Sequence, residues 1–497
     1  MRLLRSFSLL IVVCLLINLL GFPYEVVRSQ SPTSWTSWLP KVIKKSPLPP
    51  TLFGADVTPV RTQSGIIQMR DINMHWTKAG DVLWSDVEAI EGKYNWSSLS
   101  ALEDSLLLIQ AMDMQPIINV RSTPPWAQDV PGYYCGRIKL VKMAAFGKFM
   151  EALVSRYSQP PYNVKYWEIW NEPDIAPIAG AENSGLGCWG NINDKYFGGG
   201  AYAEMLKAIY ARIKAADPSA KVIAGALLLD CDPNPPVNGR CQESSKKSIS
   251  FLEGILRHNG QNDGAKYFDL ISFHAYDYAF YDLNRDPSNP WNESLGIYGS
   301  PNWSTNWDKE HTALGAKADF ISKQFQTRGI PLKPMLATEL AILCGSNSAP
   351  PGTAPCYSDP ASAFEQTKAY YLTRAYLDAF YYDLQGALWY RALGWRNSNL
   401  LNGDLTPRPV YYALQTARMS LSNSTVLGTI QSFPGVFGYK FDRGDRLVWV
   451  IWSLDGLNHQ VNLGSVPLSA YDTFGVPIEL NSILTIDMKP IYLEWPR

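Results

Sequence analysis

The chain has 497 residues, a formal net charge of −1 at pH 7 and 46% hydrophobic residues. This length exceeds one ordinary domain and predicts one large domain with a small companion. The near-neutral charge gives no electrostatic reason to expect a polyanionic partner, so nucleic-acid binding is disfavoured. Only five histidines occur in the whole chain, and we therefore expect no metal site and no other cofactor.

The first 50 residues predict an export segment followed by a linker. Arg2 and Arg5 precede an apolar run, 9–20, which has signal-peptide length and is too short for a comfortable membrane span. We expect residues 1–29 to be a signal peptide or a signal anchor, which places the protein outside the cell or on its surface. No clear small-x-small cleavage site follows, so membrane attachment through an uncleaved segment stays an alternative. Residues 30–50 lack an apolar period and predict a linker.

Residues 51–424 alternate between short apolar strands and segments of helical period. The expected strands are 53–56, 74–79, 115–120, 166–170, 221–225, 269–274, 334–338 and 386–389. The expected helices include 99–111, 143–157, 202–216, 251–258, 316–326, 364–382 and 411–421. Strand–helix alternation predicts an α/β fold with a parallel sheet, and eight repeats favour a closed (β/α)8 TIM barrel over an open doubly wound sheet.

Residues 425–497 have a different pattern. Short strands are expected at 437–441, 446–452 and 491–494, separated by turn sequences rich in Asp, Gly and Pro. Such spacing is typical of antiparallel strands. We therefore expect a small C-terminal β domain beside the barrel.

Two of the expected barrel strands end in glutamate. Asn171, Glu172 and Pro173 close the aromatic strand 166–170, and Glu339 follows the strand 334–338. These are the fourth and seventh of the eight strands. Because the carboxyl ends of barrel strands converge over one cavity, we expect the two carboxyl groups to lie close together.

Asn-Glu-Pro after an aromatic strand resembles the acid/base motif of clan A glycoside hydrolases, and the chain is most similar to families 39 and 5. The resemblance implies an exported retaining glycosidase that cleaves β-linked O-glycosidic bonds of an oligo- or polysaccharide by double displacement, with a C-terminal β-sandwich. Glu172 would be the proton donor and then the general base, with a pKa raised by burial and by the charge of Glu339. Glu339 would be the nucleophile, about 5 to 5.5 Å away. The 17 Trp and 27 Tyr suit stacking on sugar rings.

The same resemblance assigns substrate-binding residues. Asn171 would bind the sugar 2-hydroxyl, and His274 with Tyr276 matches the His and Tyr that the clan places near the nucleophile. Trp389, at the end of the eighth strand, is similar to the clan's sugar platform. Trp126, after the third strand, is a weaker candidate for substrate binding. A structural histidine and core packing are the alternatives for His274 and Trp389.

One position departs from the clan pattern. The clan usually has an arginine after the second strand that supports the nucleophile, and the nearest position here is Lys78. Lysine supplies charge but not the planar fork of arginine. Arg70 is either the compensating residue or a surface charge on a helix.

Of the seven cysteines, Cys14 lies in the export segment and six remain, an even number that favours disulfides in an exported protein. Two pairs enclose short loops rich in Pro, Gly, Asn or Ser: Cys231 with Cys241, and Cys344 with Cys356. By elimination Cys135 would pair with Cys188. Connectivity does not follow from sequence alone, and free buried thiols are the alternative.

A second class of function is a catalytically silent carbohydrate-binding or cell-surface protein on the same barrel. The presence of both glutamates and of Asn171 disfavours it. An esterase or a zinc hydrolase is disfavoured because the chain has neither a Gly-x-Ser-x-Gly nor a His-Glu-x-x-His sequence. The sequence leaves open which sugar and linkage are recognised and whether the attack is at chain ends or within chains.

Overall fold

The computed structural model describes residues 51–177, 185–229, 249–282, 297–298, 311–344, 353–355 and 363–497. The predicted signal or anchor segment, the linker, Cys231, Cys241 and Cys356 lie outside the described residues. Within these ranges, none of the helices has the length and apolar character needed to cross a membrane.

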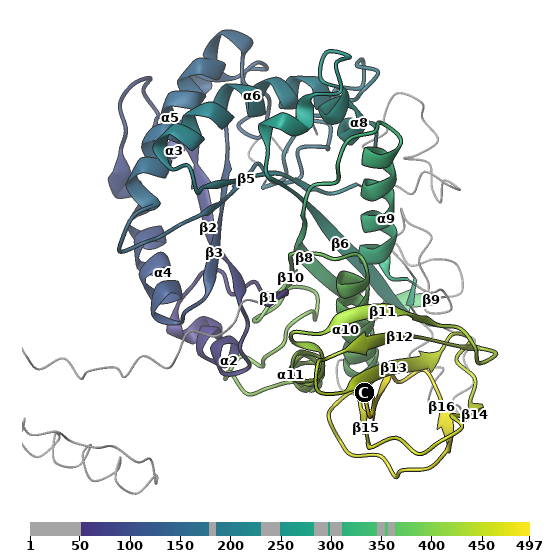
Figure 1. Ribbon diagram of the computed structural model, residues 1–497. Coiled ribbons are helices and arrows are strands. Elements are labelled where there is room, and N and C mark those ends of the chain that lie inside the picture. Colours follow the sequence, from purple (N-terminus) through teal and green to yellow (C-terminus); the bar gives the residue numbers. More distant parts are fainter. Residues whose placement is uncertain are drawn as a thin grey trace, which may run out of the picture. The chain divides into compact units, whose positions relative to one another are not determined.

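Eight parallel strands form a closed barrel (Figure 1). In chain order they are β1 Phe53–Ala55, β2 Trp76–Leu83, β3 Gln115–Arg121, β4 Tyr166–Ile169, β5 Lys221–Leu227, β6 Leu270–Asp282, β8 Met335–Cys344 and β10 Gly386–Trp389. Each strand pairs in parallel with the next, and β10 closes the ring against β1. The (β/α)8 barrel predicted from the sequence is therefore confirmed.

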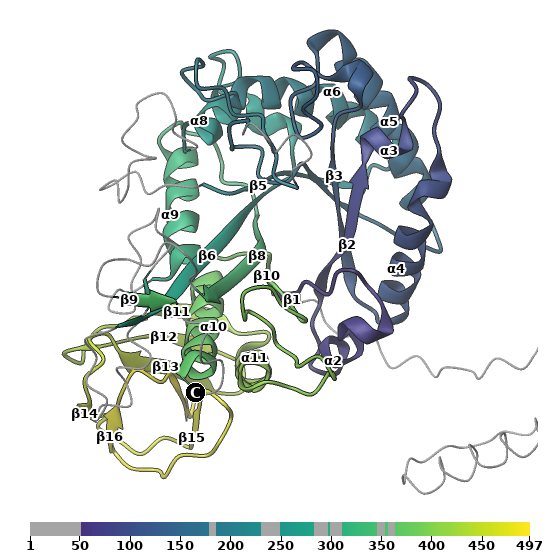
Figure 2. The same cartoon turned by 180° about the vertical axis from the view of Figure 1, so that it is seen from behind.

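Helices surround this barrel on its outside, as the two views in Figures 1 and 2 show. They are α2 Ile66–Asp71, α3 Trp84–Val87, α4 Ser100–Ala111, α5 Met143–Tyr157, α6 Gly199–Ala216, α8 Ile249–Arg257, α9 Ala313–Gln326, α10 Ala363–Tyr381 and α11 Pro409–Leu421. Short 3-10 turns lie at Thr62–Ser64, Trp96–Leu99, Pro125–Ala127, Leu140–Lys142 and Gly264–Tyr267. Helix α5 shows why these segments are helical: Phe146, Phe149, Met150 and Leu153 recur at helical spacing and are all buried.

The interior of the barrel holds an apolar layer with one side chain from each of six strands. Its members are Trp76, Ile117, Ile223, Leu270, Leu336 and Leu388. Most of them stand in the first half of their strands, so they fill the amino-terminal half of the barrel. Such stacked interior layers make a barrel a packed core and leave its carboxyl end for a site.

Strands β6 and β8 continue well beyond the expected ends at 274 and 338. Their parallel pairing runs from Ile271↔Met335 to Ala279↔Cys344, since apolar side chains continue past Glu339 in β8. Two short strands, β7 Ile297–Tyr298 and β9 Thr353–Pro355, pair antiparallel with the extension of β6. The expectation that Glu339 follows the end of its strand is therefore wrong, because Glu339 lies within β8.

The C-terminal part forms an antiparallel sheet with the order β11-β12-β13-β17-β15 and a separate strand pair, β14 with β16. Their bounds are β11 Thr425–Ile430, β12 Val436–Asp442, β13 Leu447–Ser453, β14 His459–Asn462, β15 Ser469–Asp472, β16 Ile483–Ile486 and β17 Ile491–Trp495. The predicted C-terminal β region is confirmed. Phe441 of β12 packs edge-on against Phe380 of α10, with ring centroids 5.6 Å apart. The chain from Leu48 to Arg497 is one compact unit.

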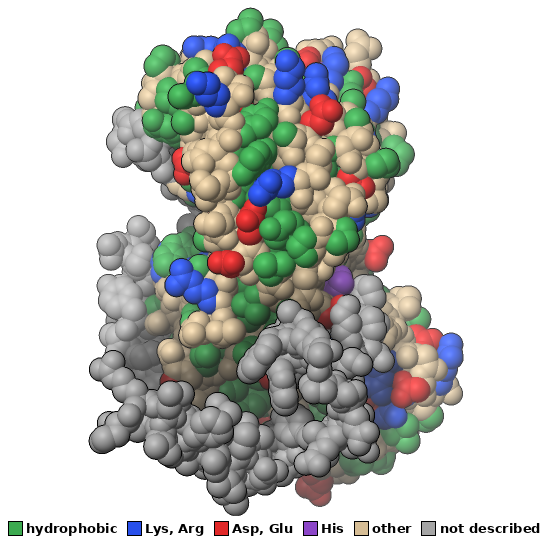
Figure 3. All heavy atoms as spheres, turned by 90° about the vertical axis from the view of Figure 1, so that its left-hand side faces the viewer, with side chains coloured by type: hydrophobic (Ala, Val, Ile, Leu, Met, Phe, Trp, Pro, Cys, Tyr) green, Lys and Arg blue, Asp and Glu red, His purple; other side chains and the backbone are tan. Residues whose placement is uncertain are grey.

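The surface shown in Figure 3 carries lysine and arginine side chains interspersed with aspartate and glutamate. Some surface charges are paired between helices, such as Arg212 of α6 with Glu151 of α5 at 2.8 Å. Exposed pairs of this kind contribute little to stability, and a mixed surface creates no large field of one sign.

Candidate active site

A polar layer lies directly above the apolar layer inside the barrel. Lys78, Asn119 and Ser272, on β2, β3 and β6, each stand two residues after a member of the apolar layer. Glu168, on β4, stands two residues after Tyr166, which packs against that layer. Because side chains alternate along a strand, these four point into the barrel like their apolar predecessors. All four are buried. The change from apolar to polar therefore marks the floor of the candidate site.

Glu168 is the centre of this polar layer and is fully buried. Its carboxylate accepts a hydrogen bond from Ser272 Oγ at 2.8 Å and from Asn119 Nδ2 at 3.2 Å, and it lies 3.8 Å from Lys78 Nζ. Glu168 is not among the site residues predicted from the sequence. The available signal was a carboxylate at an inward position of an otherwise apolar barrel strand, where it requires partners.

Glu339 is held as a carboxylate by two donors, one from β2 and one from β6. Lys78 Nζ donates to Oε1 at 2.6 Å, and the Tyr276 hydroxyl donates to Oε2. Burial alone would raise the pKa of Glu339, but His274, Lys78 and the two hydrogen bonds outweigh it and lower the pKa to about 2. Glu339 is therefore ionised over the ordinary pH range.

Lys78 occupies the position at which the clan pattern has an arginine. Burial alone would lower its pKa, but the carboxylates of Glu339 and Glu168 outweigh this and raise the pKa above its usual value. Arg70 instead lies in the short helix α2 and donates to Asn73 Oδ1 at 3.2 Å. The charge that supports Glu339 therefore comes from Lys78, which contacts two carboxylates with a single ammonium group.

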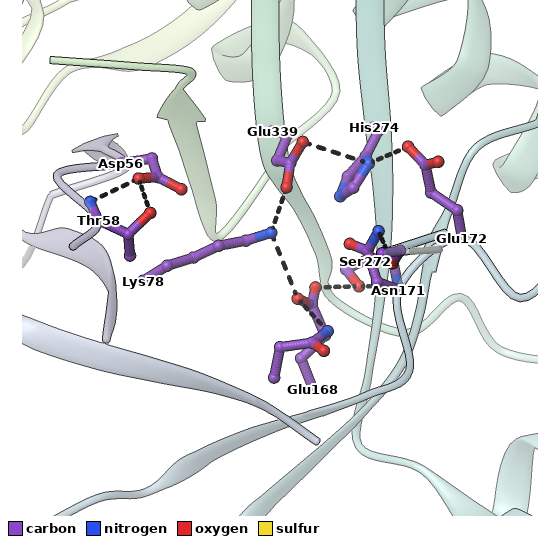
Figure 4. Close-up of polar contacts among 12 residues, drawn as sticks. Asp56, Thr58, Lys78, Glu168, Asn171, Glu172, Ser272, His274 and Glu339 are labelled. Carbon is purple, nitrogen blue, oxygen red and sulfur yellow. Dashed lines mark hydrogen bonds and ion pairs between the residues drawn. The ribbon is translucent and has the colours of Figure 1, made fainter. Parts of the chain in front are cut away.

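His274 connects the two glutamates that the sequence singled out (Figure 4). Its Nδ1 lies 2.7 Å from Glu172 Oε1 and 3.6 Å from Glu339 Oε2. The histidine is fully buried, Glu172 is 5% exposed, and His274 Nε2 has no hydrogen-bond partner among the described residues. The structure thus brings Glu172, Glu339, His274 and Tyr276 together, with both carboxyl groups facing one ring nitrogen.

The segment after β4 holds Glu172 in a constrained backbone conformation. Trp170 and Glu172 have positive φ angles of 73° and 47°, which cost roughly 1–3 kcal/mol each for non-glycine residues. Hydrogen bonds offset this cost: Glu172 N–H donates to Ala226 O at 2.9 Å, Trp170 Nε1 to Cys135 O at 2.9 Å and Asn119 Nδ2 to Trp170 O at 2.8 Å. Strain of this kind accumulates at functional sites.

Asp174, two residues after Glu172, fixes the same segment to the end of β5. Its carboxylate accepts the backbone N–H groups of Leu228 at 2.9 Å and Leu229 at 2.7 Å. Burial raises the pKa of Asp174 to about 7, although these two hydrogen bonds act in the opposite direction. Asp174 is not among the site residues predicted from the sequence, because nothing local distinguishes a buried aspartate from a loop aspartate.

Asn171 and Trp126 lie at the edge of this arrangement. Asn171 Nδ2 donates to Gly185 O at 3.2 Å, and the side chain is half-buried. Trp126 is half-buried, donates from Nε1 to Glu88 O at 2.9 Å and packs edge-on against Trp84. These contacts place Trp126 on the β2–β3 side of the barrel mouth, and its part in substrate binding stays a prediction.

Trp389 does not form a sugar platform. It is fully buried, its Nε1 donates to Ser398 O at 2.7 Å, and its ring packs against Tyr371 of α10. The reason is strand alternation: Leu388 points into the barrel, so Trp389 points outward to the helices and Tyr390 inward again. The prediction that Trp389 forms the sugar platform is wrong, because the inward-facing position is one residue later, at Tyr390.

Three aromatic rings form a cluster around Tyr276, whose hydroxyl donates to Glu339. The centroids of Tyr276, Tyr390 and Trp395 are 6.1 to 6.3 Å apart in each pair, and Trp395 is 48% exposed. Burial and then the charge of Glu339 raise the pKa of Tyr390. Tyr390 and Trp395 are not among the site residues predicted from the sequence, although strand alternation after Leu388 would have indicated Tyr390.

Asp56 adds a further carboxylate at the end of β1 (Figure 4). Its Oδ1 accepts hydrogen bonds from Thr58 N at 2.7 Å and Thr58 Oγ1 at 2.6 Å, and Arg391 lies 3.4 Å away. Burial raises the pKa of Asp56, and the charges of Arg391 and Lys78 act against that increase. From the sequence, Asp56 is expected only as the end of the first strand.

A disulfide joins Cys135, after β3, to Cys188, after β4, with a Cα–Cα distance of 5.3 Å. The pairing expected by elimination is therefore confirmed. It covalently joins the segment after β4, which contains Glu172, to the loop after β3. Cys344, the last residue of β8, is also disulfide-bonded, but Cys356 lies outside the described residues and this pairing stays a prediction.

Comparison with known proteins gives matches only at the level of structure. No protein-family model and no curated protein sequence matches the chain. A family 39 glycoside hydrolase from the gut symbiont Bacteroides cellulosilyticus WH2 is 18% identical, with a TM-score of 0.59 over 90% of this chain and 81% of that chain. The family 30 subfamily 8 xylanase of Clostridium acetobutylicum is 13% identical, with a TM-score of 0.56 over 90% and 96%. A monomeric β-xylosidase from Caulobacter crescentus CB15 is 15% identical, with a TM-score of 0.51 over 89% and 96%.

These matches cover the barrel and the C-terminal sheet together, so the chain has the fold of clan A glycoside hydrolases. The resemblance found in the sequence is confirmed in this sense, with families 39 and 30 as the structural neighbours. At identities below 20% the likeness concerns the fold, and the activity has to be argued from the site.

Proposed function

We propose that the protein is a retaining glycoside hydrolase that cleaves O-glycosidic bonds of β-linked sugars by double displacement. One observation carries this proposal: carboxyl oxygens of Glu172, just after β4, and of Glu339, within β8, lie 2.7 and 3.6 Å from the same nitrogen of His274. Retaining enzymes require two carboxyl groups about 5 to 5.5 Å apart, so that one attacks the sugar directly.

In the first step Glu339 is the nucleophile. Its carboxylate attacks the anomeric carbon, the bond from that carbon to the leaving oxygen breaks, and Glu172 transfers its proton to that oxygen. The low pKa of Glu339, about 2, supports this role because the nucleophile must be ionised. The hydrogen bonds from Lys78 and Tyr276 hold one oxygen each and orient the carboxylate.

In the second step Glu172 is the general base. It takes a proton from water, the water oxygen attacks the anomeric carbon, and the bond to Glu339 breaks. The negative charge therefore moves from Glu339 to Glu172 and back during each cycle. His274 contacts both carboxyl groups through Nδ1, so a small movement of the imidazole is enough to contact whichever carboxyl group is charged.

For sugar binding we propose the exposed face of Trp395 with Tyr390 as the stacking surface, because aromatic rings stack on the C–H faces of sugars. Asn171 is proposed to donate to the 2-hydroxyl in exchange for its hydrogen bond to Gly185 O. Trp126 remains the candidate for a more distant sugar unit on the β2–β3 side.

The proposed location is outside the cell or on its surface, and the proposed partner is an oligo- or polysaccharide. The Cys135–Cys188 disulfide supports this location, since disulfides persist in oxidising compartments. Of the three structural neighbours, one is named a β-xylosidase and one a xylanase, which makes β-xylosides and xylan the first substrates to assay.

A screen of aryl β-glycosides and soluble polysaccharides tests the activity, and NMR of the first-formed product tests the mechanism. We expect the product to keep its anomeric configuration. A 2-deoxy-2-fluoro glycoside of the accepted sugar should form a covalent adduct on Glu339, and Glu339→Gln, which keeps the size of the side chain, is the control that forms none. An inverted product or an adduct on another residue would refute the assignment, and binding without any turnover would favour a carbohydrate-binding protein.

A further inference from the structure

Lys317 of α9 is a buried lysine that reaches the candidate site from behind β6. It is 2% exposed, and its Nζ donates to Leu228 O at 2.7 Å and to His274 O at 2.9 Å. A buried amino group is costly unless its hydrogen bonds are made, so the position of Nζ is closely defined by these carbonyl groups. One of the two belongs to the histidine that contacts both glutamates.

These two carbonyl groups lie where the hydrogen-bonded pairing between β5 and β6 ends. The pairing of β5 with β6 ends at Leu227↔Phe273; Leu228 directly follows β5, and His274 is the next residue of β6. On the other side of β6, the pairing with β8 shifts register between Phe273 and His274. Two carbonyl oxygens are both acceptors and cannot bond to one another. The amino group of Lys317 supplies the donors that join them.

The end of β5 is also tied to the segment that carries Glu172. Glu172 N–H donates to Ala226 O at 2.9 Å, and the Asp174 carboxylate accepts the N–H groups of Leu228 and Leu229. Lys317 therefore joins the backbone of His274 to the same short segment that fixes the backbone of Glu172. Through it the two side chains that meet at 2.7 Å share one support.

The helix that carries Lys317 is fixed at its amino end. Thr312, the N-cap of α9, donates from its backbone N–H and from Oγ1 to Asp378 at 2.7 Å each. Ala313 N–H donates to Asp277 of β6 at 3.0 Å. Carboxylates at a helix N-terminus satisfy its free N–H groups and are favoured by its dipole. Lys317 is one turn further along, so it has little freedom relative to β6.

We propose that Lys317 is a positioning residue that fixes His274 between the acid/base carboxyl group and the nucleophile. It acts through backbone carbonyl groups, and its catalytic consequence rests on the proposed glycosidase function. The distances from His274 Nδ1 to the two carboxyl groups differ by less than 1 Å, so a small displacement of β6 changes which carboxyl group forms a hydrogen bond to the imidazole. Misplacement by about 1 Å can cost up to about 10²-fold in rate.

The test compares Lys317→Met with Lys214→Met. Lys214 contacts Ala220 O and lies 2.8 Å from the Asp269 carboxylate, just before β5 and β6 begin, so it joins the same two strands at the opposite end of the barrel. Imidazole ¹⁵N NMR observes His274 directly, and loss of a signal in His274→Gln assigns it among five histidines. Steady-state kinetics on the best substrate gives kcat and KM.

We expect Lys317→Met to shift the His274 ¹⁵N signals and to lower kcat about 10-fold or more, with KM changed less than about 2-fold. Lys214→Met should change neither. If Lys317→Met does not fold, Lys317→Gln, which keeps an amide donor, should show the same changes at smaller size.

Unchanged His274 signals in a folded Lys317 variant overturn the proposal, and so do shifted signals with an unchanged kcat. The NMR measurement needs no substrate. A wild-type protein that hydrolyses no glycoside would therefore refute the glycosidase function, while the hold of Lys317 on His274 is still tested separately.

Discussion

The two carboxyl groups at the site have different neighbours, and the neighbours distinguish their roles. Glu339 receives hydrogen bonds from Lys78 and Tyr276, which stabilise its ionised form. Among the described residues Glu172 pairs with no lysine or arginine, and it meets the imidazole of His274 at 2.7 Å. Environments that treat two carboxyl groups differently are how one site holds both an acid and a nucleophile. The assignment of roles therefore depends on side chains that are far away in the sequence.

Glu172→Gln should preserve the fold and lower turnover by about 10²-fold or more on substrates with poor leaving groups, because general acid catalysis is typically worth that much. An activated aryl glycoside needs little protonation of its leaving oxygen and should lose less in the first step. Pre-steady-state rates across a series of leaving groups measure this. Equal losses for leaving groups of very different pKa would remove Glu172 from the role.

Tyr276→Phe should move the acid limb of the kcat/KM profile to higher pH. The Tyr276 hydroxyl helps to lower the pKa of Glu339 to about 2, so its loss raises that pKa, and activity is lost as pH falls through it. We expect a shift of about one pH unit or more, since a hydrogen bond to a charged group is worth roughly 1.5–3 kcal/mol.

The matched control for this change is Tyr376→Phe. Tyr376 is also fully buried, and its hydroxyl donates to Gly54 O at 2.8 Å, without contact to Glu339. The acid limb of the kcat/KM profile of Tyr376→Phe should lie at the same pH as in the wild type. An identical acid limb in Tyr276→Phe and in the wild type would contradict the role of Tyr276.

At the scale of elements, the loops after β3 and β4 form one unit with the catalytic segment. The disulfide between Cys135 and Cys188 joins them, and Trp170 Nε1 donates to the carbonyl of Cys135. The cross-link therefore acts near Glu172 and outside the barrel core. Reduction should loosen the loops of the barrel mouth before it weakens the barrel.

Non-reducing peptide mapping should find two further disulfides, Cys231–Cys241 and Cys344–Cys356. The reasons are the short loops they enclose, the even number of cysteines outside the export segment, and the disulfide-bonded state of Cys344. The Cys135–Cys188 bridge is the positive control in the same digest. Alkylation of the four cysteines in native, unreduced protein would show that the prediction is wrong.

At the scale of the whole molecule, the barrel and the C-terminal sheet share one hydrophobic core. Tyr439 and Trp452, from β12 and β13, belong to the same buried cluster as barrel residues such as Trp389. Tyr439 also donates to Asp378 of α10 at 2.8 Å, and Asp378 binds the N-cap of α9. The sheet is thus connected to the helix that supports the site.

Because of this shared core, the barrel and the sheet should unfold in one transition. Urea unfolding followed by near-UV circular dichroism and by loss of activity should give the same midpoint. Tyr439→Phe, which leaves the buried Asp378 without one of its donors, should lower the free energy of unfolding by roughly 1–3 kcal/mol and move both midpoints together. Two separate transitions would contradict this and would support independent folding of residues 425–497.

Most of the elements and one half of the site could be predicted because their signals are local. The expected helix at 143–157 and the expected strand at 386–389 match α5 and β10 at both ends. Asn171 and Glu172 stand together in one motif at the end of β4. Strand and helix periods and a contiguous motif depend on neighbouring residues, so a single sequence contains them.

The remaining features depend on how distant segments meet, and only the tertiary structure decides them. Lys78 and Glu339 are 261 positions apart, yet they bond at 2.6 Å because β2 and β8 enclose the same barrel. The burial of Trp389 and the inward place of Tyr390 follow from strand register, where a shift of one residue reverses the face. The hydrogen bond from Lys317 to the backbone carbonyl of His274 likewise requires α9 to pack behind β6. Local pattern determines the elements, and packing across the barrel determines the electrostatics of the site.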